Sequence, residues 1–408
     1  MSHPAEPDVS ARPAGRSGLP DLLYSEHETE LRAAVRSLLE DRCSWRDVLA
    51  RTETDEPYDT GLWRMLAADL GCAGLLVHEE HGGAGASYSE AAAAAEELGR
   101  FVAPVPYLGS AVVATAAVIA AGDANLLAVL ADGSVTAALA VPFAAAPGAR
   151  PEMTVRLGGP AAAGPSAGYR LTGSVSCVAD ALPADVLLVP VDGVPFGLYE
   201  VSAGDAGVTR TPVTSLDQTR QLADITLDGA TGQLIASGEA AERAISAALT
   251  AGAAILAAEQ LGLAERCLEM TVAYVKERYQ FARPVGSFQA IKHRLADLWV
   301  VVTQARAASR YAAACLADGD PDAPVAVALA KAACSDAAVL AAQECVQLHG
   351  GIGFTWAHPV HLYLKRAKSS SIGYGTTDWH RGRLASLANL PGPAGGARRS
   401  RSAAPAWW

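Results

Sequence analysis

The stretch that decides the fold reads Glu277-Arg-Tyr-Gln-Phe-Ala-Arg-Pro-Val-Gly-Ser-Phe-Gln-Ala-Ile-Lys-His-Arg-Leu-Ala-Asp297. Arg278 opens a loop that leaves one predicted helix, and Gln289 begins the next. A guanidinium in such a loop can hold a pyrophosphate through charge-assisted hydrogen bonds, and Gln289 can contact the same ligand. The alternative is an ordinary arginine at a solvated helix end, and these residues taken alone favour that simpler interpretation.

A second block, Gln347-Leu-His-Gly-Gly-Ile-Gly-Phe354, lies farther along the chain. The adjacent glycines Gly350 and Gly351 let backbone N–H groups approach a ligand closely, as phosphate-binding loops require. The alternative is a helix that ends with Gly350 as its C′ residue. A helix cap and a ligand-binding loop are compatible interpretations of this block.

Together, the two blocks resemble the acyl-CoA dehydrogenase family of flavoproteins, in the family's order and at about its separation. The first block is similar to the family signature Arg-x-x-Phe-Gly-x-x-(Ile/Val)-x-x-Phe-Gln, with Ala282 in place of the glycine. The resemblance implies FAD as the cofactor, bound at a site that spans two subunits. The positions that it assigns to FAD binding are Arg278, Phe281, Gln289, Gln347, Gly350, Gly351, Thr376 and Asp378.

Periodicity along the chain predicts helices, then a sheet, then helices, which is an α+β fold that is mainly α. Helical patterns cover residues 21–134 and 238–390, and short β-favouring runs separated by Gly, Pro and Asp fill residues 135–237 as a compact antiparallel sheet. The resemblance implies an N-terminal helical domain, a β-barrel middle domain and a C-terminal four-helix bundle. Residues 1–20 and 391–408 are rich in Pro, Gly, Ser and Ala, and are predicted to be disordered.

Composition excludes several classes of partner. The formal charge of −11 disfavours nucleic acid and anionic membrane surfaces, and no apolar run reaches the roughly 18 residues of a membrane span. The seven cysteines form no CxxC pair and no cluster with histidines, so a metal site is not expected. Cysteines of this kind are typical of reduced thiols in the cytoplasm.

The family's chemistry removes the α-proton of an acyl thioester while hydride leaves the β-carbon for the flavin, which requires a carboxylate base. Family members carry this glutamate at one of three positions. Here the three positions hold Tyr374, Gly252 and Ala357. The third lies in Gly353-Phe-Thr-Trp-Ala-His358, which is otherwise similar to a bacterial subgroup that reads Gly-Phe-Thr-Trp-Glu-His.

Other groups could replace the missing base. Asp378 lies just beyond Gly375-Thr376, and His358 and His380 could accept a proton at neutral pH. Each has a simpler interpretation as a structural or surface residue, so the catalytic base stays unassigned. The middle domain also departs from the family: Cys177 stands where a tryptophan covers the flavin, and the Thr-Glu-Pro phrase is absent.

The sequence therefore predicts an FAD-dependent acyl-CoA dehydrogenase that desaturates an acyl thioester carried on CoA or a carrier protein. Two alternatives stay open. One is a base-lacking subunit that shares FAD with a paralogue in a hetero-oligomer, and the other is a flavin-free homologue that binds thioesters. The expected partners are the thioester, an electron-transfer flavoprotein or other acceptor, and further subunits of a dimer or tetramer.

Overall fold

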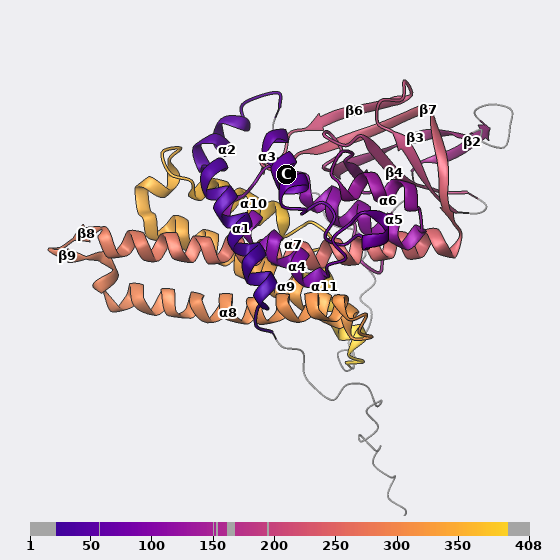
Figure 1. The fold of residues 1–408 in the computed structure, drawn as a ribbon. Coiled ribbons are helices and arrows are strands. Elements are labelled where there is room, and N and C mark those ends of the chain that lie inside the picture. The colour runs from indigo at the N-terminus through magenta and orange to yellow at the C-terminus, as the bar shows by residue number, and fades with distance from the viewer. Residues whose placement is uncertain are drawn as a thin grey trace, which may run out of the picture.

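The computed structural model describes residues 22–56, 58–149, 151, 154–160, 168–193 and 196–390. The segments predicted to be disordered, 1–20 and 391–408, lie outside these ranges. In chain order one sheet lies between an N-terminal and a C-terminal group of helices, and in space the two groups of helices pack directly against each other with the sheet to one side (Figure 1). The predicted α+β, mainly α fold class is therefore confirmed.

The N-terminal part is helical and begins with well-capped elements. Ser25 and Ser87 each accept a hydrogen bond from the backbone of the helix that follows, while Glu28 and Glu90 bond back to the cap, so both helices begin with a capping box. The elements are α1 (Glu26–Arg42), α2 (Trp45–Arg51), α3 (Thr60–Arg64), η1 (Met65–Asp69), η2 (Glu79–His81), α4 (Tyr88–Phe101), η3 (Tyr107–Ala114), α5 (Thr115–Ala121) and α6 (Ala124–Ala131).

The middle part is a seven-stranded sheet in the order β1-β4-β5-β7-β3-β2, with β6 paired to β7. An isolated bridge between Arg156 and Asp192 joins β2 back to the end of β4, so the strands curve towards a barrel. The strands are β1 (Ala137–Leu139), β2 (Arg156–Pro160), β3 (Tyr169–Ala179), β4 (Val186–Val191), β5 (Gly197–Ser202), β6 (Val208–Val213) and β7 (Leu222–Ser237).

Two details of the sheet differ from the sequence prediction. The sheet was predicted to be antiparallel, which holds for the other strand pairs but not for β1, which pairs with β4 in parallel. Strands β1 and β6 were not predicted at all, since β1 is only three residues long and β6 contains Pro212. Both lie at positions where pairing with a longer strand, rather than local propensity, fixes the conformation.

The C-terminal part is built on three long helices, α7 (Glu239–Glu277), α8 (Gln289–Ala317) and α9 (Ala323–His349). Two shorter helices, α10 (Val360–Ser370) and α11 (Thr377–Leu387), pack on α9. The turns η4 (Val285–Ser287) and η5 (Gly350–Phe354) complete this part. Between α7 and α8 the hairpin β8 (Tyr279–Gln280) and β9 (Arg283–Pro284) projects at the end farthest from the sheet (Figure 1).

Two core helices are more apolar than the sequence analysis recognised. Helix α7 and the segment Ala323–Phe354 are each long and apolar enough to cross a membrane by length and composition alone. The expectation that no apolar run reaches this length was therefore wrong. Within the fold, 83% and 67% of their most apolar windows are buried, which is typical of helices that form the centre of a bundle.

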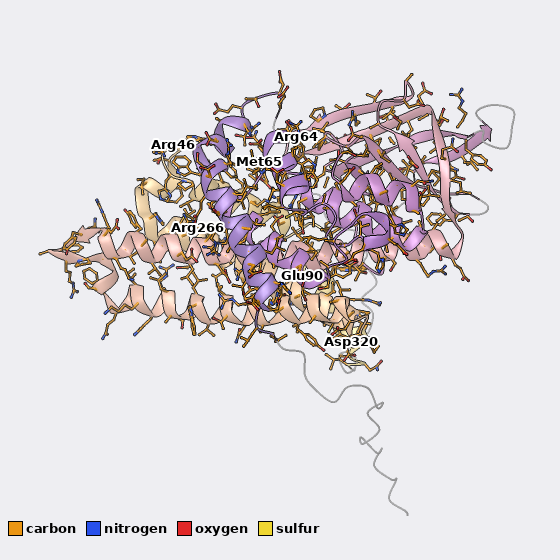
Figure 2. The ribbon with its side chains drawn as sticks, viewed as in Figure 1. Arg46, Arg64, Met65, Glu90, Arg266 and Asp320 are labelled. Carbon is orange, nitrogen blue, oxygen red and sulfur yellow. The ribbon has the colours of Figure 1, made fainter. Side chains whose placement is uncertain are left out.

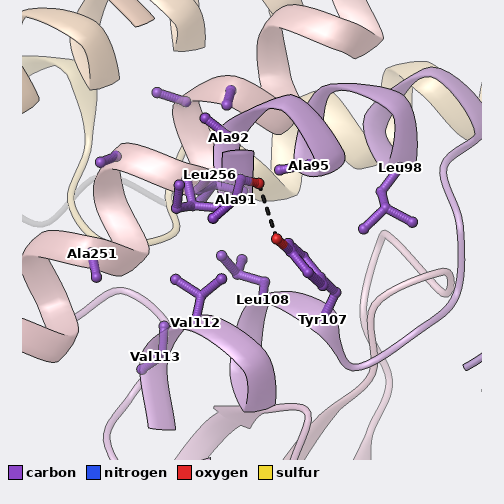
Figure 3. Packing of buried hydrophobic residues seen from close by; sticks show 14 of the residues in the cluster. Ala91, Ala92, Ala95, Leu98, Tyr107, Leu108, Val112, Val113, Ala251 and Leu256 are labelled. Carbon is purple, nitrogen blue, oxygen red and sulfur yellow. Dashed lines mark hydrogen bonds between the residues drawn. The ribbon is translucent and has the colours of Figure 1, made fainter. Parts of the chain in front are cut away.

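Helices α4 and α7 cross in direct backbone contact. A Cβ atom on Gly262 would lie 1.8 Å from the carbonyl oxygen of Glu96, and one on Gly99 would lie 2.0 Å from that of Glu259. Alanines of α4 pack beside this crossing against η3 and α7 (Figure 3). The Tyr107 hydroxyl donates to the carbonyl of Ala91 at 3.0 Å and ties η3 to α4.

The crossing predicts a large cost for a single methyl group. Gly262→Ala is expected to lower the free energy of unfolding by about 1–3 kcal/mol, because the added methyl must displace the backbone of α4. Gly382→Ala in α11 is the matched control, since no atom lies within 4 Å of its Cβ position. Urea denaturation of both variants tests this, and an unchanged midpoint for Gly262→Ala would contradict it.

Candidate functional site

The hairpin end of α7 and α8 gathers most of the predicted cofactor residues. Arg278 caps α7, Phe281 lies at the hairpin tip with 87% of its surface exposed, and Gln289 begins α8 as predicted. The C-terminal end of α9 is joined to the same place, because Tyr274 of α7 stacks on His349 with ring centroids 4.4 Å apart. Figure 2 shows the side chains at this end projecting into solvent.

This hairpin end has the chemistry of an anion site that is open to a ligand. Within the described part of the chain, no acidic side chain pairs with the guanidinium of Arg278. Gly350 has a φ of +62°, which glycine adopts without strain, and no atom lies within 4 Å of a Cβ position on Gly350 or Gly351. Packing inside the chain therefore does not require Gly351, whereas close approach of a molecule from outside would. These residues fit a diphosphate.

Thr376 and Asp378 lie elsewhere, at the start of α11. Thr376 accepts a hydrogen bond from the backbone of Trp379 at 3.3 Å, and the side chain of Asp378 is 96% exposed. Asp336 of α9 binds this segment through Arg381 at 2.6 Å. Asp336 precedes Gln347 by 11 residues on α9. The group at the start of α11 therefore lies about 16 Å along α9 from the group at the hairpin end. The predicted cofactor residues therefore form two separate groups.

Two of the three expected glutamate positions converge in space. A Cβ atom on Gly252 would lie 3.0 Å from the ring of Tyr374, so a single side chain can fill the place that both positions face. Ala357 lies elsewhere. Its neighbour His358 contacts His349, and His349 stacks on Tyr274 of α7. Tyr274 lies about 33 Å along α7 from Gly252, so Ala357 is far from the other two positions.

The carboxylates near Tyr374 are already bound to other groups. Asp180 accepts hydrogen bonds from the Tyr58 hydroxyl at 2.7 Å and from the backbone of Gly109 at 2.9 Å. Burial raises the pKa of Asp180, with Arg220 opposing the shift. Glu259 is held between two arginines, Arg220 and Arg366. Burial alone would raise the pKa of Glu259, and these two arginines hold it below its ordinary value.

The suggested substitutes for the base are weak ones. Burial, with smaller contributions from neighbouring histidines, lowers the pKa of His358 to about 4. Burial also lowers the pKa of His380 to about 4, and its Nε2 lies 2.8 Å from the carbonyl of Tyr374. A base with so low a pKa takes up a proton poorly at neutral pH. The side chain of Asp378 is exposed to solvent, whereas Tyr374 is buried.

Sequence reasoning missed two buried residues beside this site, Phe143 and Lys331. Phe143 packs against Tyr374 with ring centroids 5.4 Å apart. The absence of the Thr-Glu-Pro phrase marked this segment as unusual but did not identify the residue that fills it. Within the described ranges, no three His, Cys, Asp or Glu side chains are grouped so that they could hold a metal ion.

Comparison with known proteins places both helical parts in one family. Sequence models of the acyl-CoA dehydrogenase N-terminal and C-terminal domains match residues 25–127 and 242–388. Acyl-CoA dehydrogenase IpdE2 of Mycobacterium tuberculosis is 37% identical over 85% of this chain and 92% of its own length. The ChsE4-ChsE5 complex from the same species has a TM-score of 0.79 at 29% identity, covering 91% of this chain and 100% of the matched chain. A variant of the Tcur3481-Tcur3483 steroid ACAD has a TM-score of 0.76 at 30% identity, covering 89% and 98%.

The buried amine of Lys331 leads us to expect that the stability of the protein depends on pH. Its Nζ donates to Ser335 Oγ at 2.8 Å and to the carbonyl of Ser370 at 3.0 Å, and burial lowers its pKa from 10.5 to about 7. Between about pH 7 and 10.5 the unfolded chain binds more protons at this amine, so stability rises with pH. Lys331→Met removes this component.

Urea denaturation at pH 7 and pH 9 measures the effect. The difference in unfolding free energy between the two pH values is expected to shrink in Lys331→Met and to persist in Lys276→Met, which alters an exposed lysine of α7. An equal difference in wild type and Lys331→Met would show that Lys331 keeps its charge on folding.

Proposed function

Because the chain belongs to the acyl-CoA dehydrogenase family, whose members are FAD-dependent oxidoreductases acting on CH–CH bonds, we propose that it is the base-lacking subunit of a hetero-oligomeric acyl-CoA dehydrogenase. A paralogue that carries the catalytic glutamate holds FAD, and this chain contributes its hairpin end to the same FAD. The assembly desaturates the α,β bond of an acyl thioester. Electrons then pass to an electron-transfer flavoprotein or another acceptor.

One observation carries this proposal: among the described residues, no free carboxylate lies at the place shared by Tyr374 and Gly252. Asp180 and Glu259 are the nearby carboxylates, and both are fully engaged with donors of this chain. Burial raises the pKa of the Tyr374 phenol, which makes it a poorer acid and leaves it protonated at neutral pH. Loss of a general base costs roughly 10²–10⁴-fold in rate. A partner must therefore supply the base.

The hairpin end gives this chain a role in binding the partner's cofactor. When bound, FAD supplies the hydride acceptor. The Arg278 guanidinium is free to bind its diphosphate, and the backbone N–H groups of Gly350 and Gly351 can approach the same oxygens. Gln289 is the first residue of α8, where the positive end of the helix dipole favours an anion. These groups bind and orient the cofactor without taking part in proton transfer.

The named relatives support a paired assembly and suggest a substrate. The ChsE4-ChsE5 complex and Tcur3481-Tcur3483 are each named for two components, and the second is described as a steroid ACAD. A polycyclic acyl thioester is therefore the first substrate to test. Exposed aromatic side chains at the hairpin end, with Tyr279 at 64% and Phe354 at 79%, are available to pack against a second subunit.

Co-expression tests the proposal directly. We expect a glutamate-bearing paralogue encoded beside this chain to co-purify with it as a yellow complex. Under anaerobic conditions an acyl-CoA should bleach the flavin absorbance of the complex and leave the chain alone unchanged. Bleaching by this chain alone would mean that a homomeric site is complete and that a hidden base exists, which would overturn the proposal.

A single arginine tests the contribution of the hairpin end. Arg278→Ala in the complex is expected to raise the dissociation constant for FAD about 10- to 100-fold, because hydrogen bonds to charged groups contribute about 1.5–3 kcal/mol. Arg243→Ala is the matched control, since it removes an exposed arginine from the opposite end of α7. Equal FAD affinity in both variants would exclude Arg278 from the cofactor site.

A further inference from the structure

This chain has two half-sites, each of which could form one side of a flavin site, and they differ in whether they can admit a flavin. The first is the hairpin end around Arg278, which is open and would serve a flavin held by a partner. The second lies between the sheet and the loop that carries Tyr374 (the Tyr374 loop), where the resemblance places the chain's own flavin. In that arrangement Cys177 stands at the position that covers the flavin in the family, and Tyr374 lies beyond the thioester. A flavin and a thioester therefore both need room between Cys177 and Tyr374.

The space needed for two stacked layers is considerable. Non-bonded carbon atoms pack about 3.5–4.0 Å apart. A flavin ring and an acyl chain between two surfaces need three such separations: from the first surface to the ring, from the ring to the acyl chain, and from the acyl chain to the second surface. In this structure Phe143 bonds to both surfaces. Its N–H donates to the carbonyl of Cys177 at 2.9 Å, and its carbonyl accepts from the N–H of Tyr374 at 2.8 Å. Backbone hydrogen bonds thus join the sheet to the loop through one residue.

The side chains make the closure complete. Phe143 and Tyr374 are 5% and 3% exposed, and their rings meet edge to face at 76°. A Cβ atom on Gly373 would lie 2.3 Å from the Phe143 ring. The Tyr374 ring also lies against Gly252, and the guanidinium of Arg220 lies 5.5 Å from the Phe143 ring. The two rings therefore fill the space between the sheet and the loop that carries Tyr374.

We infer that Phe143 and Tyr374 form a plug that closes this chain's own flavin half-site. This inference rests on the proposed function and adds a stoichiometry to it: each pair of unlike subunits binds one FAD, at the site completed by this chain's hairpin end. Two copies of this chain bind none. The residues present do not fit a flavin at this place, whereas those of the hairpin end do.

The flavin content of the wild-type complex is the first test. Flavin released from a known amount of complex should equal one FAD per pair of subunits. Arg278→Ala should then remove nearly all of the flavin after dialysis, since the single bound FAD depends on the hairpin end. Two FAD per pair, of which one survives in Arg278→Ala, would overturn the plug and leave the proposed function intact.

Opening the plug is the second test. Phe143→Ala combined with Tyr374→Gly removes both rings, and glycine suits position 374 because Tyr374 has a φ of +50°. The complex is expected to rise from one FAD per pair towards two. Leu39→Ala, which opens a cavity in distant α1, is the control and should keep one. A folded double variant that still binds one FAD would contradict the inference.

The chain alone separates failure of the plug from failure of the proposed function. Titration with FAD, followed by flavin fluorescence, should show no binding to wild type and measurable binding to the double variant. If no hetero-oligomer forms but this difference is seen, the plug stands and the partner assignment falls. If the wild-type chain alone binds FAD and also keeps it in Arg278→Ala, the plug is wrong. If the double variant does not fold, the wild-type stoichiometry still decides.

Discussion

The crossing of α4 and α7 is the constraint on which the rest of the structure depends. Gly99 and Gly262 let the two helix backbones touch, and this contact fixes the position of α7 in the molecule. With 39 residues, α7 is about 58 Å long. It carries Gly252 beside the sheet and Arg278 at the hairpin. One helix therefore positions both half-sites. It holds them so far apart that one chain cannot use both of them on the same flavin.

Buried charges join the sheet to the helices around the closed half-site. Arg366 contacts Glu259 and Asp217, and Arg220 contacts the same glutamate. Removing one side chain from such a buried ion pair leaves the other charge uncompensated, which is strongly destabilising. These charges lie near the expected catalytic position, yet each is engaged with a structural partner. Their arrangement links the segment before β7 to α7 and α10, and among the described residues it leaves no free carboxylate beside Tyr374.

Local sequence signals predicted the features that depend on local chemistry. The α+β class and the start of α8 at Gln289 followed from periodicity and from the Arg278 block. Strand β1 could not be predicted, because its three residues, Ala137 to Leu139, are too few to carry a strand pattern and are held by pairing with β4. The same applies to the site. The family resemblance gave Tyr374, Gly252 and Ala357 as three alternative positions of the base, whereas only tertiary packing separates Ala357 from the other two and brings Phe143 onto Tyr374.

The proposed division of labour has a thermodynamic consequence for assembly. A ligand that binds the paired subunits and not the separated ones stabilises the pair by RT ln(1 + [L]/Kd), about 2.7 kcal/mol when its concentration is 100-fold above Kd. With one FAD bound between unlike subunits, the flavin favours the mixed pair. A pair of two identical copies of this chain gains nothing from FAD, because each copy offers Arg278 to a half-site that Phe143 closes. In the proposed assembly the plug thus selects the partner as well as the number of flavins.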